Sequence, residues 1–140
     1  MTERAPSGSP PPSEVRIAGT LTQLAPLAAA ICERYYREFP DEIERYGEAG
    51  GQWCRHDNQW LLSWAVGDVL GATSLTEQVC WLARVLHARD FPVARLARNL
   101  QIAAELASEG GFGARSPAVA ACLNQAADTV AGLEFPAPVA

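Results

Sequence analysis

Apolar residues recur every three or four positions along most of the chain, which is the spacing of one face of an α-helix. Six helices are expected on this basis, at about residues 20–37, 41–48, 52–70, 74–89, 90–109 and 116–133. No stretch alternates apolar and polar residues for long enough to predict a strand. The pattern therefore predicts an all-α, single-domain bundle of five to six helices, and it does not distinguish a bundle from a globin-like array.

Two groups of residues define the expected helix boundaries most clearly. Ser74 and Glu77 form an S-x-x-E capping box, in which the serine side chain accepts a hydrogen bond from a backbone N–H of the first turn. Gly47, Gly50 and Gly51 are expected to end the helix at 41–48 and to separate it from the helix at 52–70. That helix is apolar on most sides, so we expect it to lie at the centre of the bundle.

The 140 residues match the size of one domain, and 49% of them are hydrophobic. We expect a disordered tail over residues 1–14, an all-α domain over 15–133 and a loose tail over 134–140, because both ends are rich in proline. The net charge is −5, and all eleven basic residues are arginine. An acidic chain is not typical of a general nucleic-acid binder.

Neither the N-terminal segment nor the spacing of the cysteines indicates a protein outside the cytoplasm. The N-terminus has no apolar signal-peptide core, and no run of eighteen apolar residues predicts a membrane span. Four cysteines are scattered at positions 32, 54, 80 and 122, with no CxxC pair. This usage is typical of buried thiols in a reducing compartment, so we expect a cytoplasmic protein.

No set of residues predicts a reaction or a metal site. His56 and His87 are the only histidines, and neither is spaced to pair with a nucleophile or with ligating cysteines. We therefore expect no catalytic residues, no metal and no cofactor.

The helix at 52–70 carries the most unusual pattern in the chain. Trp53, Asp57, Trp60 and Trp64 fall at i, i+4, i+7 and i+11, so they share one stripe of the helix. One interpretation is an aromatic pocket in which Asp57 orients a ligand. The other is a tryptophan-rich wedge in the core. A carboxylate among indoles must find a partner or shift its pKa upward.

Charged segments suggest partners for this stripe and for the whole chain. Arg84 or Arg89 from a neighbouring helix is a plausible partner for Asp57. Residues 33–48 hold six acids and three arginines, whereas residues 84–98 hold four arginines and one acid. Such opposite patches can steer a partner or pair two copies of the chain, or they can be ordinary surface variation.

Several short motifs resemble those of one known family. They are Arg45-Tyr46-Gly47, Cys54-x-x-Asp57, Ala65-Val66-Gly67-Asp68, Trp81-Leu82 and Ala88-Arg89-x-Phe91-Pro92. On these motifs, residues 43–107 resemble a helical module of bacterial signalling and sensor proteins, found alone or beside a cobalamin-binding domain. The family has a His-Leu pair where this chain has Trp60-Leu61, and no cobalamin-binding domain fits in 140 residues. The resemblance implies a regulatory helical bundle.

Two functional hypotheses follow. The first is a non-catalytic regulatory or protein-interaction domain in bacterial signal transduction, acting as a homodimer or by docking to another signalling protein. Its expected surfaces are the tryptophan stripe together with Trp81, Arg84 and Arg89, since Trp and Arg are enriched at binding hot spots. The alternative is a small-molecule sensor that holds a hydrophobic or tetrapyrrole-like ligand in a tryptophan-lined pocket.

Overall fold

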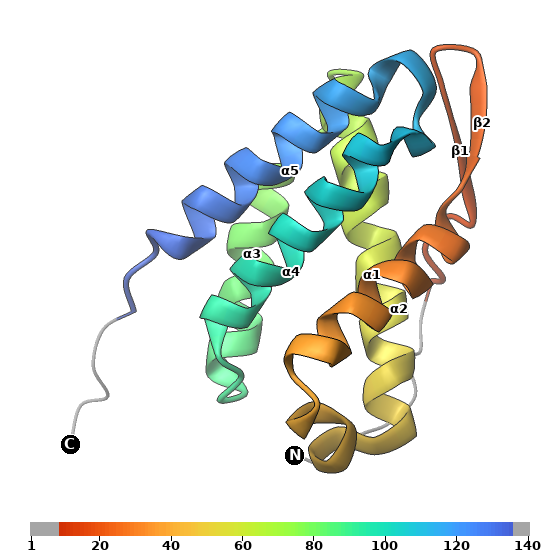
Figure 1. Cartoon of the computed structure of the whole chain (residues 1–140). Helices are drawn as coiled ribbons and strands as arrows, with labels where there is room; N and C mark the ends of the chain where they lie inside the picture. The colour runs from red at the N-terminus through yellow and green to blue at the C-terminus, as the bar shows by residue number, and fades with distance from the viewer. Residues whose placement is uncertain (1–8, 136–140) are drawn as a thin grey trace.

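The computed structural model describes residues 9–135, and within them five α-helices follow a short β-hairpin (Figure 1). Successive helices run in opposite directions, so the chain forms an up-and-down bundle. The predicted all-α helical-bundle class is confirmed. The bounds are β1 Glu14–Ile17, β2 Thr20–Gln23, α1 Leu24–Glu38, α2 Asp41–Val69, α3 Leu75–Ala88, α4 Val93–Leu106, η1 Ala107–Gly111, η2 Gly113–Arg115 and α5 Ser116–Ala131.

The hairpin β1–β2 contradicts the expectation that the described part of the chain contains no strand. Its strands pair antiparallel with Glu14 opposite Gln23, and each is only four residues long, too short to give a readable alternation. Ala18 and Gly19 both take positive φ, as a two-residue turn of this kind requires. Thr22 Oγ1 then donates to the carbonyl oxygen of Gly111, 2.9 Å away, and ties the hairpin to the end of η1, which follows α4.

The first helix consequently begins later than the sequence indicates. The expected start was near residue 20, whereas α1 starts at Leu24. Pro26 then lies in the first helical turn, where its missing N–H removes no intrahelical hydrogen bond. The proline is accommodated there without a kink.

Helix α2 turns a corner at a single residue. Gly47 has φ 62° and ψ −154°, a region open almost only to glycine, so the segment before it points away from the long segment after it. Gly50 and Gly51 are helical, so the prediction that all three glycines break the chain is wrong for these two. The second and third expected helices are therefore one kinked helix (Figure 1).

The boundary between α2 and α3 follows the capping prediction. Ser74 Oγ accepts a hydrogen bond from the backbone N–H of Glu77 at 3.2 Å, and the carboxylate of Asp68 accepts one from the N–H of Leu75 at 2.8 Å. The next helix begins at Val93 and not at the expected residue 90, because Asp90 takes a left-handed conformation (φ 60°) in the turn and Pro92 directly precedes α4.

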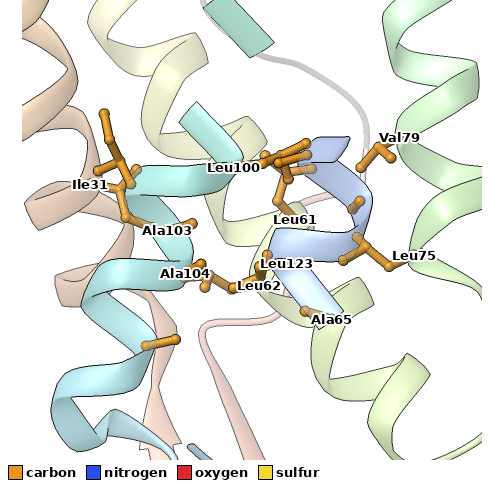
Figure 2. Packing of buried hydrophobic residues seen from close by; sticks show 14 of the residues in the cluster. Ile31, Leu61, Leu62, Ala65, Leu75, Val79, Leu100, Ala103, Ala104 and Leu123 are labelled. Atoms are coloured by element: carbon orange, nitrogen blue, oxygen red, sulfur yellow. The ribbon is translucent and has the colours of Figure 1, made fainter. Parts of the chain in front are cut away.

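The apolar core lies where α1, α2, α4 and α5 meet, with α3 covering one side. Helix α4 packs most extensively against α5, and alanines at their contact allow the two backbones to come close. Figure 2 shows part of this core, in which residues from all five helices interdigitate: Ile31, Leu61, Leu62, Ala65, Leu75, Val79, Leu100, Ala103, Ala104 and Leu123.

The expected tails over 1–14 and 134–140 fall largely outside the described residues. Of the described part, Glu14 belongs to β1, and the Phe135 ring stacks on His87 with centroids 4.1 Å apart. Among the described helices, none combines the length and the hydropathy that a bilayer span requires.

Candidate ligand-binding cavity

A cavity of about 430 Å³ lies between the α1–α2 corner and the α3–α4 hairpin. Its walls come from the second half of α1, the first two thirds of α2, the end of α3 and the start of α4, which lie together in the lower part of Figure 1. The volume is within the range of about 300–1,000 Å³ that is typical of small-molecule sites. The cavity is thus at the opposite end of the bundle from the hairpin.

Most of the wall is apolar, and aromatic rings dominate it. The aromatic lining residues are Tyr35, Tyr36, Tyr46, Trp53 and Phe91, and the aliphatic ones are Leu61, Leu82, Leu86 and Leu96. A smaller set of polar side chains also faces the space: Glu42, Cys54, Asp57, Asn58, Arg89, Arg95 and Asn99. An apolar wall with a few convergent polar groups is the usual composition of a ligand pocket.

Glu42 is a buried carboxylate at this wall, and two neighbours stabilise its charge. Arg95 Nη1 lies 2.8 Å from Glu42 Oε2, and the hydroxyl of Tyr35 donates to the same oxygen. Arg95 also binds Asp41 at 2.9 Å and lies over the Phe39 ring, 4.3 Å from its centroid. Burial, together with the hydrogen bond to Glu42, raises the pKa of Tyr35 well above its ordinary value. The network joins α1, α2 and α4 beside the cavity.

Asn58 and Asn99 form a second buried network. Their amides exchange hydrogen bonds of 3.1 and 2.8 Å across α2 and α4, and each residue is less than a tenth exposed. Asn58 also donates to the carbonyl of Cys54 at 3.0 Å. Contact with the Cys32 thiol and burial raise the pKa of Cys54, so this thiol remains protonated at neutral pH.

Asp57 is the less compensated of the two carboxylates on the wall. Its Oδ1 lies 3.1 Å from Nδ1 of His56, and a third of its side-chain surface remains exposed. Burial raises the pKa of Asp57, while the hydrogen bond with His56 and the positive charge of Arg89 partly oppose that rise. The structure therefore brings Arg89, rather than Arg84, into electrostatic reach of Asp57.

Three of the residues expected at a site converge on the cavity, namely Trp53, Asp57 and Arg89. The other members of the stripe lie beyond it. Trp60 and Trp64 stack on each other with centroids 6.0 Å apart, and they do not line the space. Trp53 and Trp64 are eleven residues apart, which is about 16.5 Å along a helix axis. Only the first part of the stripe reaches the cavity.

Trp81 and Arg84 lie on the outer face of α3. Trp81 is 53% exposed, and Arg84 is exposed as well. Neither contributes to the wall of the cavity.

Sequence reasoning missed the part of the wall supplied by other helices. Tyr35 and Tyr36 come from α1, and Arg95 and Asn99 come from α4. One signal was readable: Asn58 and Asn99 each fall among apolar core positions of a helix, where a polar side chain needs a specific partner.

The described side chains do not form a cluster suited to binding a metal ion. Within residues 9–135, no group of three or more His, Cys, Asp or Glu residues is arranged to hold a metal ion. The two histidines do not line the cavity, since His56 hydrogen-bonds to Asp57 and His87 stacks on Phe135. No family model, curated protein or solved structure matches this chain.

Proposed function

We propose that this chain is a cytoplasmic sensor domain of bacterial signal transduction, which binds a small, mainly apolar organic molecule in the cavity. The observation that carries the proposal is the combination of about 430 Å³ of space, five aromatic side chains and a few fixed polar groups. The free thiols of all four cysteines agree with a reducing compartment.

The polar groups of the wall indicate that the cavity is a binding site and not a packing defect. An ion pair fixes the orientation of Glu42 and Arg95. Hydrogen bonds between the two amides fix the orientation of Asn58 and Asn99 in the same way. Preorganised polar groups lose little entropy when a ligand binds, which favours specific recognition. Their positions therefore suit a ligand that is mainly apolar and carries a few polar atoms.

The composition of the wall favours a metal-free organic ligand over haem. Imidazole, the commonest axial ligand of haem, does not face the cavity. Cys54 does face it, but its raised pKa disfavours the thiolate that would bind iron. Flat aromatic or alkyl groups of moderate size suit the remaining surface.

A ligand bound in this cavity would contact four helices and could stabilise one arrangement of them. The wall combines the α1–α2 corner at Gly47 with the α3–α4 turn, two connections that are far apart in the sequence. A ligand that contacts both connections stabilises the arrangement in which they lie together. Such a shift in population is the means by which the domain would signal.

The interaction hypothesis retains one supporting observation, the exposure of Trp81. A half-exposed indole on the outer face of α3 is typical of a contact surface. The opposite charge patches support it less strongly, because two of the four arginines pair with acidic residues of the same chain. Arg95 binds Asp41 and Glu42, and Arg98 binds Glu38 at 2.7 Å. Light scattering of wild type and Trp81→Glu over a range of concentrations tests a homodimer.

A neutral probe tests the cavity itself. We expect 4-phenyl-1-butanol to bind with a Kd of about 1 mM or tighter, as eleven heavy atoms in an apolar site allow. Backbone amide shifts in 15N-labelled protein give the Kd. Leu86→Trp should fill the cavity and weaken binding at least tenfold, whereas Leu70→Trp, at an exposed position away from the wall, should leave it unchanged. Equal binding by both folded variants, or no binding to the wild type, would overturn the proposal.

A further inference from the structure

Of the two carboxylates on the cavity wall, Asp57 is the less fully compensated. Glu42 is neutralised by Arg95, and the two buried asparagines satisfy each other. Asp57 receives one hydrogen bond, from His56 to Oδ1, and no described residue donates to Oδ2. A partly buried carboxylate with one oxygen that accepts no hydrogen bond from the described residues favours a cation beside it.

The rings around Asp57 favour a cation as well. Trp53 lies one helical turn before Asp57 on the same face of α2, and the rings of Tyr46 and Phe91 lie 6.3 Å apart on another part of the wall. The faces of aromatic rings carry negative potential and attract ammonium groups, most strongly at Trp.

An anionic ligand finds weaker support at the same wall. Arg95, a half-buried cation, is already bound to Asp41 and Glu42. Arg89 is exposed to solvent, so its charge is screened more than a buried charge would be. A ligand carboxylate would also enter beside Asp57 and the buried Glu42, and like charges repel.

We propose that the ligand is a protonated organic amine with an aromatic or alkyl body, its ammonium group bound by Asp57 and its body held among the aromatic rings. This inference rests on the proposed function, because it names the chemical class of the molecule that fills the same cavity. Asp57 is then a binding residue, and His56 is a positioning residue that holds its carboxylate through Oδ1.

The inference carries a pH dependence of defined sign. The groups that face Asp57 are His56 on α2, Arg89 after α3, and the Cys54 thiol, which is itself close to Glu42. Burial raises the pKa of Asp57, so its carboxylate gains a proton at a higher pH than an ordinary aspartate. Binding of an amine should therefore weaken as the pH falls through that raised pKa, while binding of a neutral alcohol stays constant.

Three probes of matched shape test the charge preference in the full chain: 4-phenylbutylamine, 4-phenyl-1-butanol and 4-phenylbutyrate. We expect the amine to bind the wild type at least tenfold more tightly than the alcohol, and the carboxylate to bind most weakly. Asp57→Asn should remove the preference for the amine, so that this variant binds the amine and the alcohol with similar Kd values. Asp128→Asn, on the exposed side of α5, is the matched control and should behave as wild type.

The outcomes separate this inference from the proposed function. Equal Kd values for amine and alcohol, or an amine preference that survives in Asp57→Asn, would overturn the inference and leave the cavity proposal standing. Tightest binding of the carboxylate would identify Arg89 as the anchor and would also overturn it. Failure of all three probes to bind would overturn the proposed function itself.

Discussion

Arg95 supports a buried carboxylate, so its removal should destabilise the fold far more than removal of an exposed arginine. The side chain of Glu42 is only 6% exposed, and that of Arg95 is 25% exposed. Arg95→Met keeps much of the aliphatic stem that packs near Phe39 but removes the guanidinium. The carboxylate of Glu42 then keeps only the hydrogen bond from Tyr35.

The expected cost follows from these contacts. Breaking a buried ion pair by removing one partner costs about 3–5 kcal/mol, because the other charge is left buried. Loss of the cation–π contact with Phe39 adds about 0.5–1 kcal/mol. Since a quarter of Arg95 is in water, we expect the lower part of this range, about 3 kcal/mol, for Arg95→Met. In Glu42→Gln/Arg95→Met neither partner of the pair carries a charge. The free energy of unfolding of the double variant should therefore be only about 1 kcal/mol below that of the wild type.

Urea unfolding followed by circular dichroism measures these differences at constant m value. Arg37→Met is the control, because Arg37 lies only 2.6 Å from Glu33 but both side chains are about 70% exposed. An exposed i,i+4 pair contributes about 0.3–0.5 kcal/mol. Equal losses in Arg95→Met and Arg37→Met, or a double variant less stable than Arg95→Met, would refute the reasoning that burial decides the strength of these pairs.

Three further substitutions test other parts of the structure. Gly47→Ala should lower the free energy of unfolding by about 1–3 kcal/mol in urea, because alanine is strained at the kink, whereas Gly51→Ala in helical backbone should be neutral or stabilising. Asp57→Asn should raise the free energy of unfolding at pH 7 by up to about 1 kcal/mol, since the charged form of a group with a raised pKa is disfavoured in the folded state. This gain should shrink as the pH falls and vanish in thermal melts below about pH 4, where the side chain is protonated in both states. Asn99→Leu should cost about 2–3 kcal/mol by leaving Asn58 unsatisfied, and Asn58→Leu/Asn99→Leu should cost less, as unfolding in urea would reveal.

The helical spacing predicted the bundle because it reports which face of each helix is buried. It located the α3 start correctly, since Ser74 and Glu77 act within one turn. It missed the hairpin, because four-residue strands hold too few side chains for an alternation to be visible. It also placed breaks at Gly50 and Gly51, although only the φ and ψ of Gly47 leave the helical region, and tertiary packing decides which glycine does so.

Apart from Arg89, the candidate site could be predicted only along one helix. Trp53 and Asp57 share a face of α2, and periodicity alone is enough to pair them. Whether Trp60 belongs to the same pocket depends on the length of the neighbouring helices, which no local pattern encodes. Tyr36 and Arg95 reach the cavity from helices far apart in the sequence, so only the folded arrangement brings them together.

Intermolecular nuclear Overhauser effects between 4-phenylbutylamine and the protein test the central claim most directly, because they locate the bound molecule. The account predicts contacts from the phenyl protons to the methyl groups of Leu82 and Leu86, and contacts from the methylene group beside the nitrogen to Asp57. A second hollow lies between α4 and the end of α5, lined in part by Val93 and Val130. Contacts to those two valines alone, or none to the leucines at saturating amine, would contradict the account.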